Sequence, residues 1–130
     1  MHAVDIPGAL RSLRRLDITA QTTEEDAGAA IQVVGNFNQC MVGVVSFSGT
    51  TPWERHVDDE LLHIQEGTVQ VTLLTEEAVR EVILQTGSVC IAPSGVWHKQ
   101  CSREGVKLLF VTSREGNATS TAPDPQHTYA

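Results

Sequence analysis

Residues 52–67, with the sequence PWERHVDDELLHIQEG, contain two groups of the kind that bind metal ions, followed by a glycine. His56 stands four positions before Glu60, and Gly67 follows seven positions after Glu60. Imidazole and carboxylate groups are both common ligands of transition metals. The stretch therefore indicates one half of a metal pocket built at the ends of strands.

Residues 87–98, with the sequence GSVCIAPSGVWH, supply a third such group. Gly87 opens a short apolar run, and His98 follows the turn that ends it. We predict that turn at Pro93-Ser94-Gly95, because proline and glycine fix the backbone there. We expect the rest of the chain to fold so that the two stretches face each other.

Short apolar runs separated by turn residues fill the chain from residue 31 to residue 112. In residues 68–73 apolar and polar side chains alternate, which is typical of a strand with one solvated face. Turns are predicted at Glu66-Gly67 and at residues 103–105, among others. Turn signals recur about every 8–12 residues, and this spacing predicts an all-β barrel or sandwich.

The two ends of the chain differ from this pattern. Leucines three positions apart predict one or two helical turns within residues 9–16, and residues 21–30 are polar enough to be a loop. Residues 113–130 are rich in Ser, Thr, Pro, Asn and Gln, and we predict a flexible tail there. The chain thus divides into a single domain, residues 1–112, and this tail.

Composition excludes several classes of partner. The chain has 130 residues, which is the length of one domain, and a net charge of −7. This charge argues against a nucleic-acid partner and against binding to an anionic membrane surface. The three cysteines have no paired spacing, and no apolar run resembles a signal peptide or a membrane span. We therefore expect a cytoplasmic protein with free thiols.

Four side chains form the candidate metal site. Glu54 and His56 are two positions apart, so on a strand they project to the same face, while Glu60 and His98 complete the set. Such a set suits a divalent ion of iron, manganese, zinc, nickel or copper. Two carboxylates would also neutralise that ion in a dry pocket. Alternatively, His56 and Glu60 form a surface pair and His98 caps a turn.

The two motifs together resemble those of the cupin superfamily. Its first motif, Gly-x5-His-x-His-x3,4-Glu-x6-Gly, is matched from His56 to Gly67, and its second, Gly-x5-Pro-x-Gly-x2-His-x3-Asn, from Gly87 to His98. The resemblance covers residues 37–112. Glu54 stands where the family has its first histidine, and Ser102 stands where it has the final asparagine.

The resemblance implies a cupin-type β-barrel, or jelly roll, with the short helical segment before it. It also implies a mononuclear metal held by His56, Glu60 and His98. Glu54 would be a fourth ligand or a general acid or base beside the metal; a third alternative is a site that has lost its metal. Further pocket residues are predicted on the inward faces of the strands: Gln100, Leu62, Ile64, Phe47 and Val71.

These features leave three functions open. The first is a small metalloenzyme that acts on a small organic molecule, with dioxygenase-like or isomerase-like chemistry. The second is a non-catalytic module that binds a small molecule, with or without metal. The third is a structural or accessory protein with an inactive site. In each case the resemblance implies a homodimer that buries outward apolar residues such as Leu61 and Val89.

Overall fold

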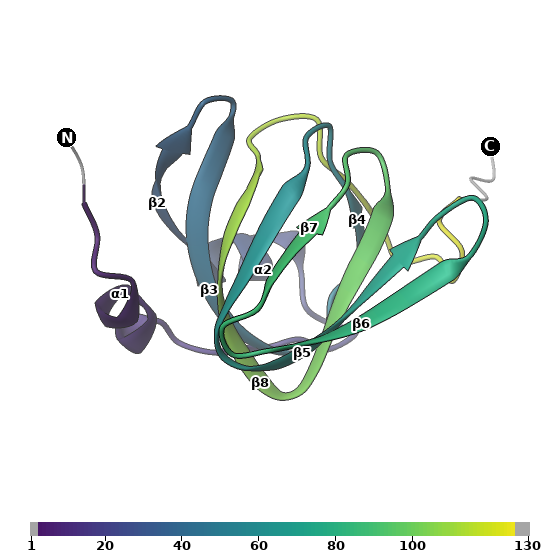
Figure 1. Ribbon diagram of the computed structural model, residues 1–130. Helices are drawn as coiled ribbons and strands as arrows, with labels where there is room; N and C mark the ends of the chain where they lie inside the picture. The colour runs from purple at the N-terminus through teal and green to yellow at the C-terminus, as the bar shows by residue number, and fades with distance from the viewer. Residues whose placement is uncertain (1–2, 127–130) are drawn as a thin grey trace.

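Strands dominate the computed structural model, which describes residues 3–126 (Figure 1). The elements, in chain order, are α1 (Ile6–Ser12), β1 (Leu16–Asp17), α2 (Glu24–Ala30), β2 (Gln32–Phe37), β3 (Cys40–Thr50), β4 (Trp53–Arg55), β5 (Glu60–Leu74), β6 (Val79–Gln85), β7 (Val89–Ala92), β8 (Trp97–Ser113) and β9 (Ala118–Ser120).

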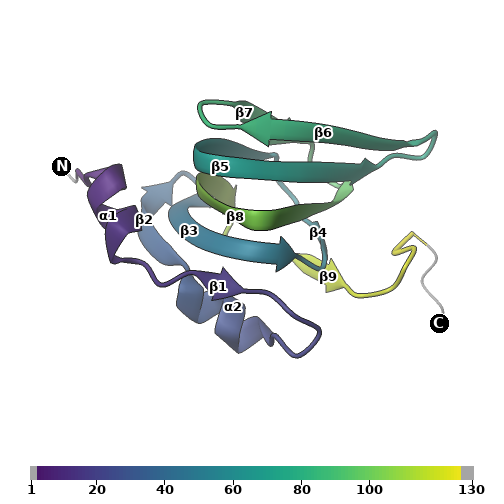
Figure 2. The ribbon, with the colours of Figure 1, turned by 90° about the horizontal axis from the view of Figure 1, so that it is seen from below.

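Two long strands, β5 and β8, run through both layers of the molecule, and the long strand β3 lies beside β8 (Figure 2). One layer has the order β2-β3-β8-β5-β7 and uses the second half of β8. The other has the order β6-β5-β8-β4-β9 and uses the first half of β8. This jelly-roll arrangement confirms the all-β prediction, although the hydrogen-bonded path through the described strands does not close into a ring.

The long strands bend at two glycines. Gly67 in β5 and Gly105 in β8 have φ angles of 97° and 114°, and the register of the β5–β8 pair shifts near Gly67. A Cβ on Gly67 would collide with the carbonyl oxygen of Gly105, so the two backbones need a residue without a side chain. The turns predicted at residues 66–67 and 103–105 are therefore wrong: these residues are bends that carry one strand from layer to layer.

The hydrophobic core lies between the two layers. It contains Leu62, Ile64, Val69 and Val71 from β5, each no more than 1% exposed. Phe47, Leu84, Val106, Leu108 and Phe110 complete it. Even-numbered residues of β5 face the core before the bend at Gly67 and odd-numbered ones after it, because the register shifts there.

The N-terminal region contains two short helices. The helix α1 confirms the predicted helical segment, but it begins at Ile6, where Pro7 suits the first turn. The loop predicted at residues 21–30 is wrong, because α2 lies there with a capping box between Thr23 and Asp26. Within residues 3–126, no helix is long and apolar enough to cross a membrane.

The C-terminal region is more structured than its composition predicts. Residues 118–120 form β9, which pairs with β4 along its whole length (Figure 2). The flexible tail predicted from residue 113 is therefore corrected for this segment, whose backbone hydrogen bonds are made to β4. Residues 127–130, the end of that predicted tail, lie outside the described residues.

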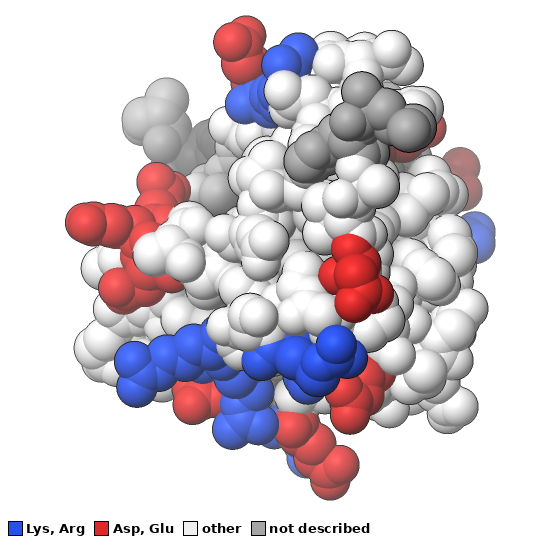
Figure 3. All heavy atoms as spheres, turned by 90° about the vertical axis from the view of Figure 1, so that its left-hand side faces the viewer, with Lys and Arg blue, Asp and Glu red and all other residues white. Residues whose placement is uncertain are grey.

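Charged side chains of both signs meet on the surface. Figure 3 shows a row of basic side chains bordered by acidic ones on one face of the molecule. Ion pairs on the surface join Arg15 to Asp17 at 2.9 Å and Lys107 to Glu66 at 3.2 Å. Acidic neighbours thus partly neutralise the basic groups.

Candidate metal centre

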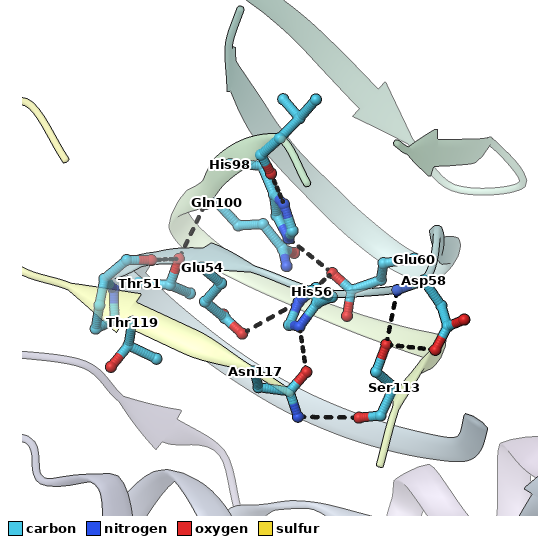
Figure 4. Close-up of polar contacts among 12 residues, drawn as sticks. Thr51, Glu54, His56, Asp58, Glu60, His98, Gln100, Ser113, Asn117 and Thr119 are labelled. Atoms are coloured by element: carbon cyan, nitrogen blue, oxygen red, sulfur yellow. Dashed lines mark hydrogen bonds and ion pairs between the residues drawn. The ribbon is translucent and has the colours of Figure 1, made fainter. Parts of the chain in front are cut away.

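Three strands, β4, β5 and β8, bring the candidate site together (Figure 4). Glu54 in β4 lies directly opposite His98 in β8, and Glu60 is the first residue of β5. His56 follows the end of β4 and is brought back over the site by the turn into β5. The side chains of all four residues point towards one another in Figure 4.

Three of these side chains lie close enough to share one ion. Potential ligand atoms of His56, Glu60 and His98 all lie within 4.8 Å of one another, and all three residues are buried. Nε2 of His98 is 2.9 Å from Oε1 of Glu60, and Nε2 of His56 is 3.7 Å from the same oxygen. The two imidazole rings are 5.1 Å apart at an angle of 51°. The spacing in the sequence thus corresponds to one cluster in space.

Glu54 lies at the edge of this cluster. Its Oε2 is 3.7 Å from Nε2 of His56, and its side chain keeps 31% of its surface exposed, against 7% for Glu60. Glu54 is therefore the acidic group of the site that reaches towards solvent.

Two buried polar atoms of the site have no hydrogen-bond partner among residues 3–126, namely Nε2 of His56 and Oε1 of Gln100. Buried polar atoms in proteins are nearly always paired. A cation between the carboxylates and the two imidazoles would supply the partner that His56 lacks. The donor set, with two nitrogens and carboxylate oxygens, also suits a divalent transition metal, so these residues fit such an ion.

The charges of the site depend on one another. Burial by itself would raise the pKa of Glu60, but its contacts with His56 and His98 lower that pKa to about 2. Burial would likewise lower the pKa of His56, but the carboxylate of Glu60 and the bond to Asn117 raise it to about 9. Burial and the negative charge of Glu60 raise the pKa of Glu54, although the charges of His56 and His98 act in the opposite direction. A proton on His56 can therefore balance Glu60, whereas a divalent ion can balance both carboxylates.

Comparison with known proteins identifies the family. A family model described as the Cupin domain matches residues 43–112. The chain belongs to the cupin family. No curated protein matches this cupin.

Solved structures share the fold of this cupin. A cupin-2 domain containing protein from Shewanella frigidimarina has 25% identity and a TM-score of 0.57, with 72% of this chain and 95% of that chain covered. Protein NMB1881 from Neisseria meningitidis has 17% identity and a TM-score of 0.65, with 85% and 98% covered. Hydroquinone 1,2-dioxygenase PnpCD, solved with Cd²⁺ and 4-hydroxybenzonitrile, has 19% identity and a TM-score of 0.57, with 82% and 85% covered.

The predicted pocket residues of this cupin fall into two groups. Gln100 is 6% exposed, and Figure 4 shows its amide beside His98 in the site. The apolar members belong to the hydrophobic core, and their predicted role in lining a pocket stays a prediction: Phe47, Leu62, Ile64 and Val71.

One residue of the site, Asn117, is not predicted from the sequence. Asn117 places its Oδ1 2.6 Å from Nδ1 of His56. It comes from the region that we predicted as a flexible tail. Only three residues after it form a strand, and their partner β4 is more than sixty positions earlier in the chain. No local signal of periodicity or turn chemistry predicts such a pairing.

A groove of about 340 Å³ lies on the outer side of His56 in this cupin. Its walls come from the end of β4, the turn before β8 and the segment before β9. They are lined by Arg55, His56, Val57, Ser94, Gly95, Gly116 and Ala118.

Proposed function

We propose that this cupin holds a divalent transition metal through His56, Glu60 and His98. The observation that carries the proposal is the meeting of three buried ligand groups within 4.8 Å. The unpaired Nε2 of His56 supports it, because a buried nitrogen lone pair aimed at two carboxylates lacks a partner that a cation would supply. Iron, manganese, zinc, nickel and copper all suit this set.

Glu54 is proposed as the fourth ligand or as a proton carrier beside the metal. Its carboxylate lies 3.7 Å from Nε2 of His56, so it would be close to an ion held by that nitrogen. Its partial exposure lets it exchange protons with solvent, as a general acid or base must. As a ligand it would bring a second negative charge, which together with Glu60 makes the loaded site neutral.

We further propose that the site acts on a small organic molecule, with dioxygenase-like or isomerase-like chemistry. The likeness to a dioxygenase solved with Cd²⁺ and a small aromatic compound supports this class of substrate. A bound metal would supply Lewis-acid polarisation of substrate oxygens. The protein would contribute Glu54 for proton transfer, Gln100 to orient a polar group, and the surrounding apolar core to exclude water.

A second candidate is a binding protein that needs no metal. The specific observation in its favour is that the site can balance its own charges. Glu60 lies 2.9 Å from His98, and the pKa of His56 is raised to about 9, so a protonated His56 neutralises Glu60 at neutral pH. Such a site would be stable without an ion and could hold a small polar ligand through Gln100 and Glu54.

Elemental analysis of protein purified without chelators or an affinity tag separates the two candidates. We expect close to one transition-metal ion per chain in the wild type and almost none in His98→Ala. The matched control is His63→Ala, which removes a histidine whose Nδ1 contacts Gln65 outside the site. A wild type without metal that still accepts no metal on titration would overturn the first candidate. Stabilisation of that protein by a metabolite in a thermal-shift screen would support the second.

Other properties inferred from the sequence stay predictions. These are the homodimer, the cytoplasmic location, the small-molecule partner and the absence of a nucleic-acid or membrane partner. The division into residues 1–112 and a tail also stays a prediction, apart from the correction at β9.

A further inference from the structure

The carboxamide of Asn117 is held on both sides. Its Oδ1 lies 2.6 Å from Nδ1 of His56, and its Nδ2 donates a hydrogen bond of 3.0 Å to the backbone oxygen of Ser113. Both contacts are partly buried. The side chain thus bridges the imidazole of the candidate metal centre and the end of β8.

The second contact fixes the direction of the first. A carbonyl oxygen can only accept a hydrogen bond, so the NH2 group of Asn117 must face Ser113 and its Oδ1 must face His56. Because Oδ1 also only accepts, Nδ1 of His56 must carry the hydrogen. In a neutral imidazole the other nitrogen, Nε2, is then left with the lone pair.

That lone pair is the one the proposed metal needs. Nε2 of His56 is buried, has no hydrogen-bond partner in the described part of the chain, and lies 3.7 Å from carboxylate oxygens of both Glu54 and Glu60. We propose that Asn117 is a positioning residue of the metal centre, which fixes the tautomer and ring orientation of His56 so that Nε2 faces the ion. This inference rests on the metal centre proposed above.

The segment that carries Asn117 is itself anchored. We name residues 114–120 the C-terminal strap. Its strand β9 pairs Thr119 with Glu54, so the strap is hydrogen-bonded to a strand of the site. Ser113, the other anchor of the carboxamide, is fixed by Asp58, because its Oγ accepts from the Asp58 amide at 3.0 Å and donates to the Asp58 carboxylate at 2.8 Å. A side chain held in this way can impose an orientation on a ring.

The inference is tested by imidazole NMR and by zinc affinity on the full chain. The variants are Asn117→Leu, which keeps the size but removes the acceptor, and Asn117→Asp, which keeps an acceptor oxygen. Thr119→Ala is the matched control, because it removes the contact of the strap with Glu24 and leaves His56 untouched. The Nδ1–H resonance of His56 is assigned by its loss in His56→Gln.

In the wild type we expect a downfield, slowly exchanging Nδ1–H of His56 in both the metal-free and the zinc-bound protein. Asn117→Leu should lose that resonance and about 10–100-fold in zinc affinity, the usual effect of removing a partner of a ligand histidine. Asn117→Asp keeps the acceptor but loses the bond to Ser113, so it should retain the resonance and a higher zinc affinity than Asn117→Leu. Thr119→Ala should match the wild type.

Results of two kinds would contradict the inference, one for the role of Asn117 and one for the metal centre. Unchanged zinc affinity in Asn117→Leu, or an affinity of Asn117→Asp no higher than that of Asn117→Leu, would overturn the role of Asn117 alone. A wild type that binds no zinc or other transition metal would overturn the metal centre itself, whereas the metal-free spectra would still show whether Asn117 holds the ring. If Asn117→Leu does not fold, Asn117→Ala takes its place, and a wild-type zinc affinity in that variant would overturn the role of Asn117.

Discussion

Glu60 is the side chain on which the candidate centre depends. It contacts both histidines, and its side chain is buried, whereas that of Glu54 is partly exposed. The sequence predicts Glu60 as a neighbour of His56 and His98, and the structure shows both contacts. The two sequence motifs fix where these residues stand along their strands, and the fold then brings the strands together. The sequence could not predict that Glu54 would stay partly exposed, because exposure depends on how the surrounding loops cover the site.

Replacing Glu60 by glutamine should therefore weaken metal binding strongly. Glu60→Gln keeps the shape of the side chain but removes the negative charge between the two imidazoles. We expect metal affinity to fall by more than about 100-fold, the upper end for partners that act through a ligand, because this residue would be a ligand itself. Isothermal titration with zinc measures the change. Glu66→Gln, at an exposed ion pair, is the control, and an equal loss there would contradict the assignment.

Two glycines make a matched test of core packing. A Cβ on Gly43 in β3 would collide with the ring of Phe110, whereas a Cβ on Gly28 in α2 would meet nothing within 4 Å. We expect Gly43→Ala to lower the free energy of unfolding by about 1–3 kcal/mol through overpacking. Gly28→Ala should raise it by up to about 1 kcal/mol through helix propensity. Urea denaturation of both variants gives the two values, and a stabilised Gly43→Ala would show that the ring can move aside.

At the scale of elements, the strands with β-branched alternation could be predicted and the short elements could not. Residues 68–73 show the period of two, and they lie in β5. The helix α2 buries no side chain, so it has no apolar face to reveal it, and only its capping box marks its start. The bends at Gly67 and Gly105 have the same local signature as turns, and only the long-range pairing of β5 with β8 distinguishes them.

The contact between β1 and β3 should stabilise the fold less at acidic pH. Asp17 accepts hydrogen bonds from Ser48 at 2.7 Å and from Arg15 at 2.9 Å. The bond from Ser48, together with Arg15, lowers the pKa of this carboxyl below 3.8. Because the folded protein has the lower pKa, the charge of Asp17 stabilises it above pH 3.8, and this stabilisation is lost as the pH falls through the lowered value.

This pH dependence is measured with Asp17→Asn. The free energy of unfolding of the wild type should exceed that of the variant at neutral pH, and the difference should shrink as the pH falls below about 4. Glu76→Gln, in the hairpin between β5 and β6, is the control for a general charge effect. A difference that grows on acidification would contradict the role of Asp17.

At the scale of the whole molecule, a metal ion should stabilise the fold, because its ligands come from three separate parts of the chain. An ion that binds only the folded state at a concentration 100 times its Kd adds about 2.7 kcal/mol to the free energy of unfolding. Thermal unfolding with and without added metal should show a rise in Tm for the wild type. His98→Ala should show none, and an equal rise there would indicate binding elsewhere.

The predicted homodimer is also a property of the whole molecule. Val89 and Ile91 on β7 keep 56% and 48% of their surface exposed, although both are apolar. If a second copy covers them, the solution mass should be twice that of the chain, and Val89→Glu should shift it towards the monomer. Light scattering coupled to size-exclusion chromatography measures both masses. A wild-type monomer at high concentration would contradict the prediction.

The distance along the chain between His56 and Asn117 has a consequence for biosynthesis. The two residues are 61 positions apart, so the ribosome adds Asn117 about 3 to 12 seconds after His56 at ordinary rates of synthesis. During that interval the imidazole has no fixed tautomer, and a nascent chain can offer either nitrogen to a passing ion. If the proposed metal centre forms, a ligand set with a fixed His56 tautomer would be complete only after Asn117 has been translated.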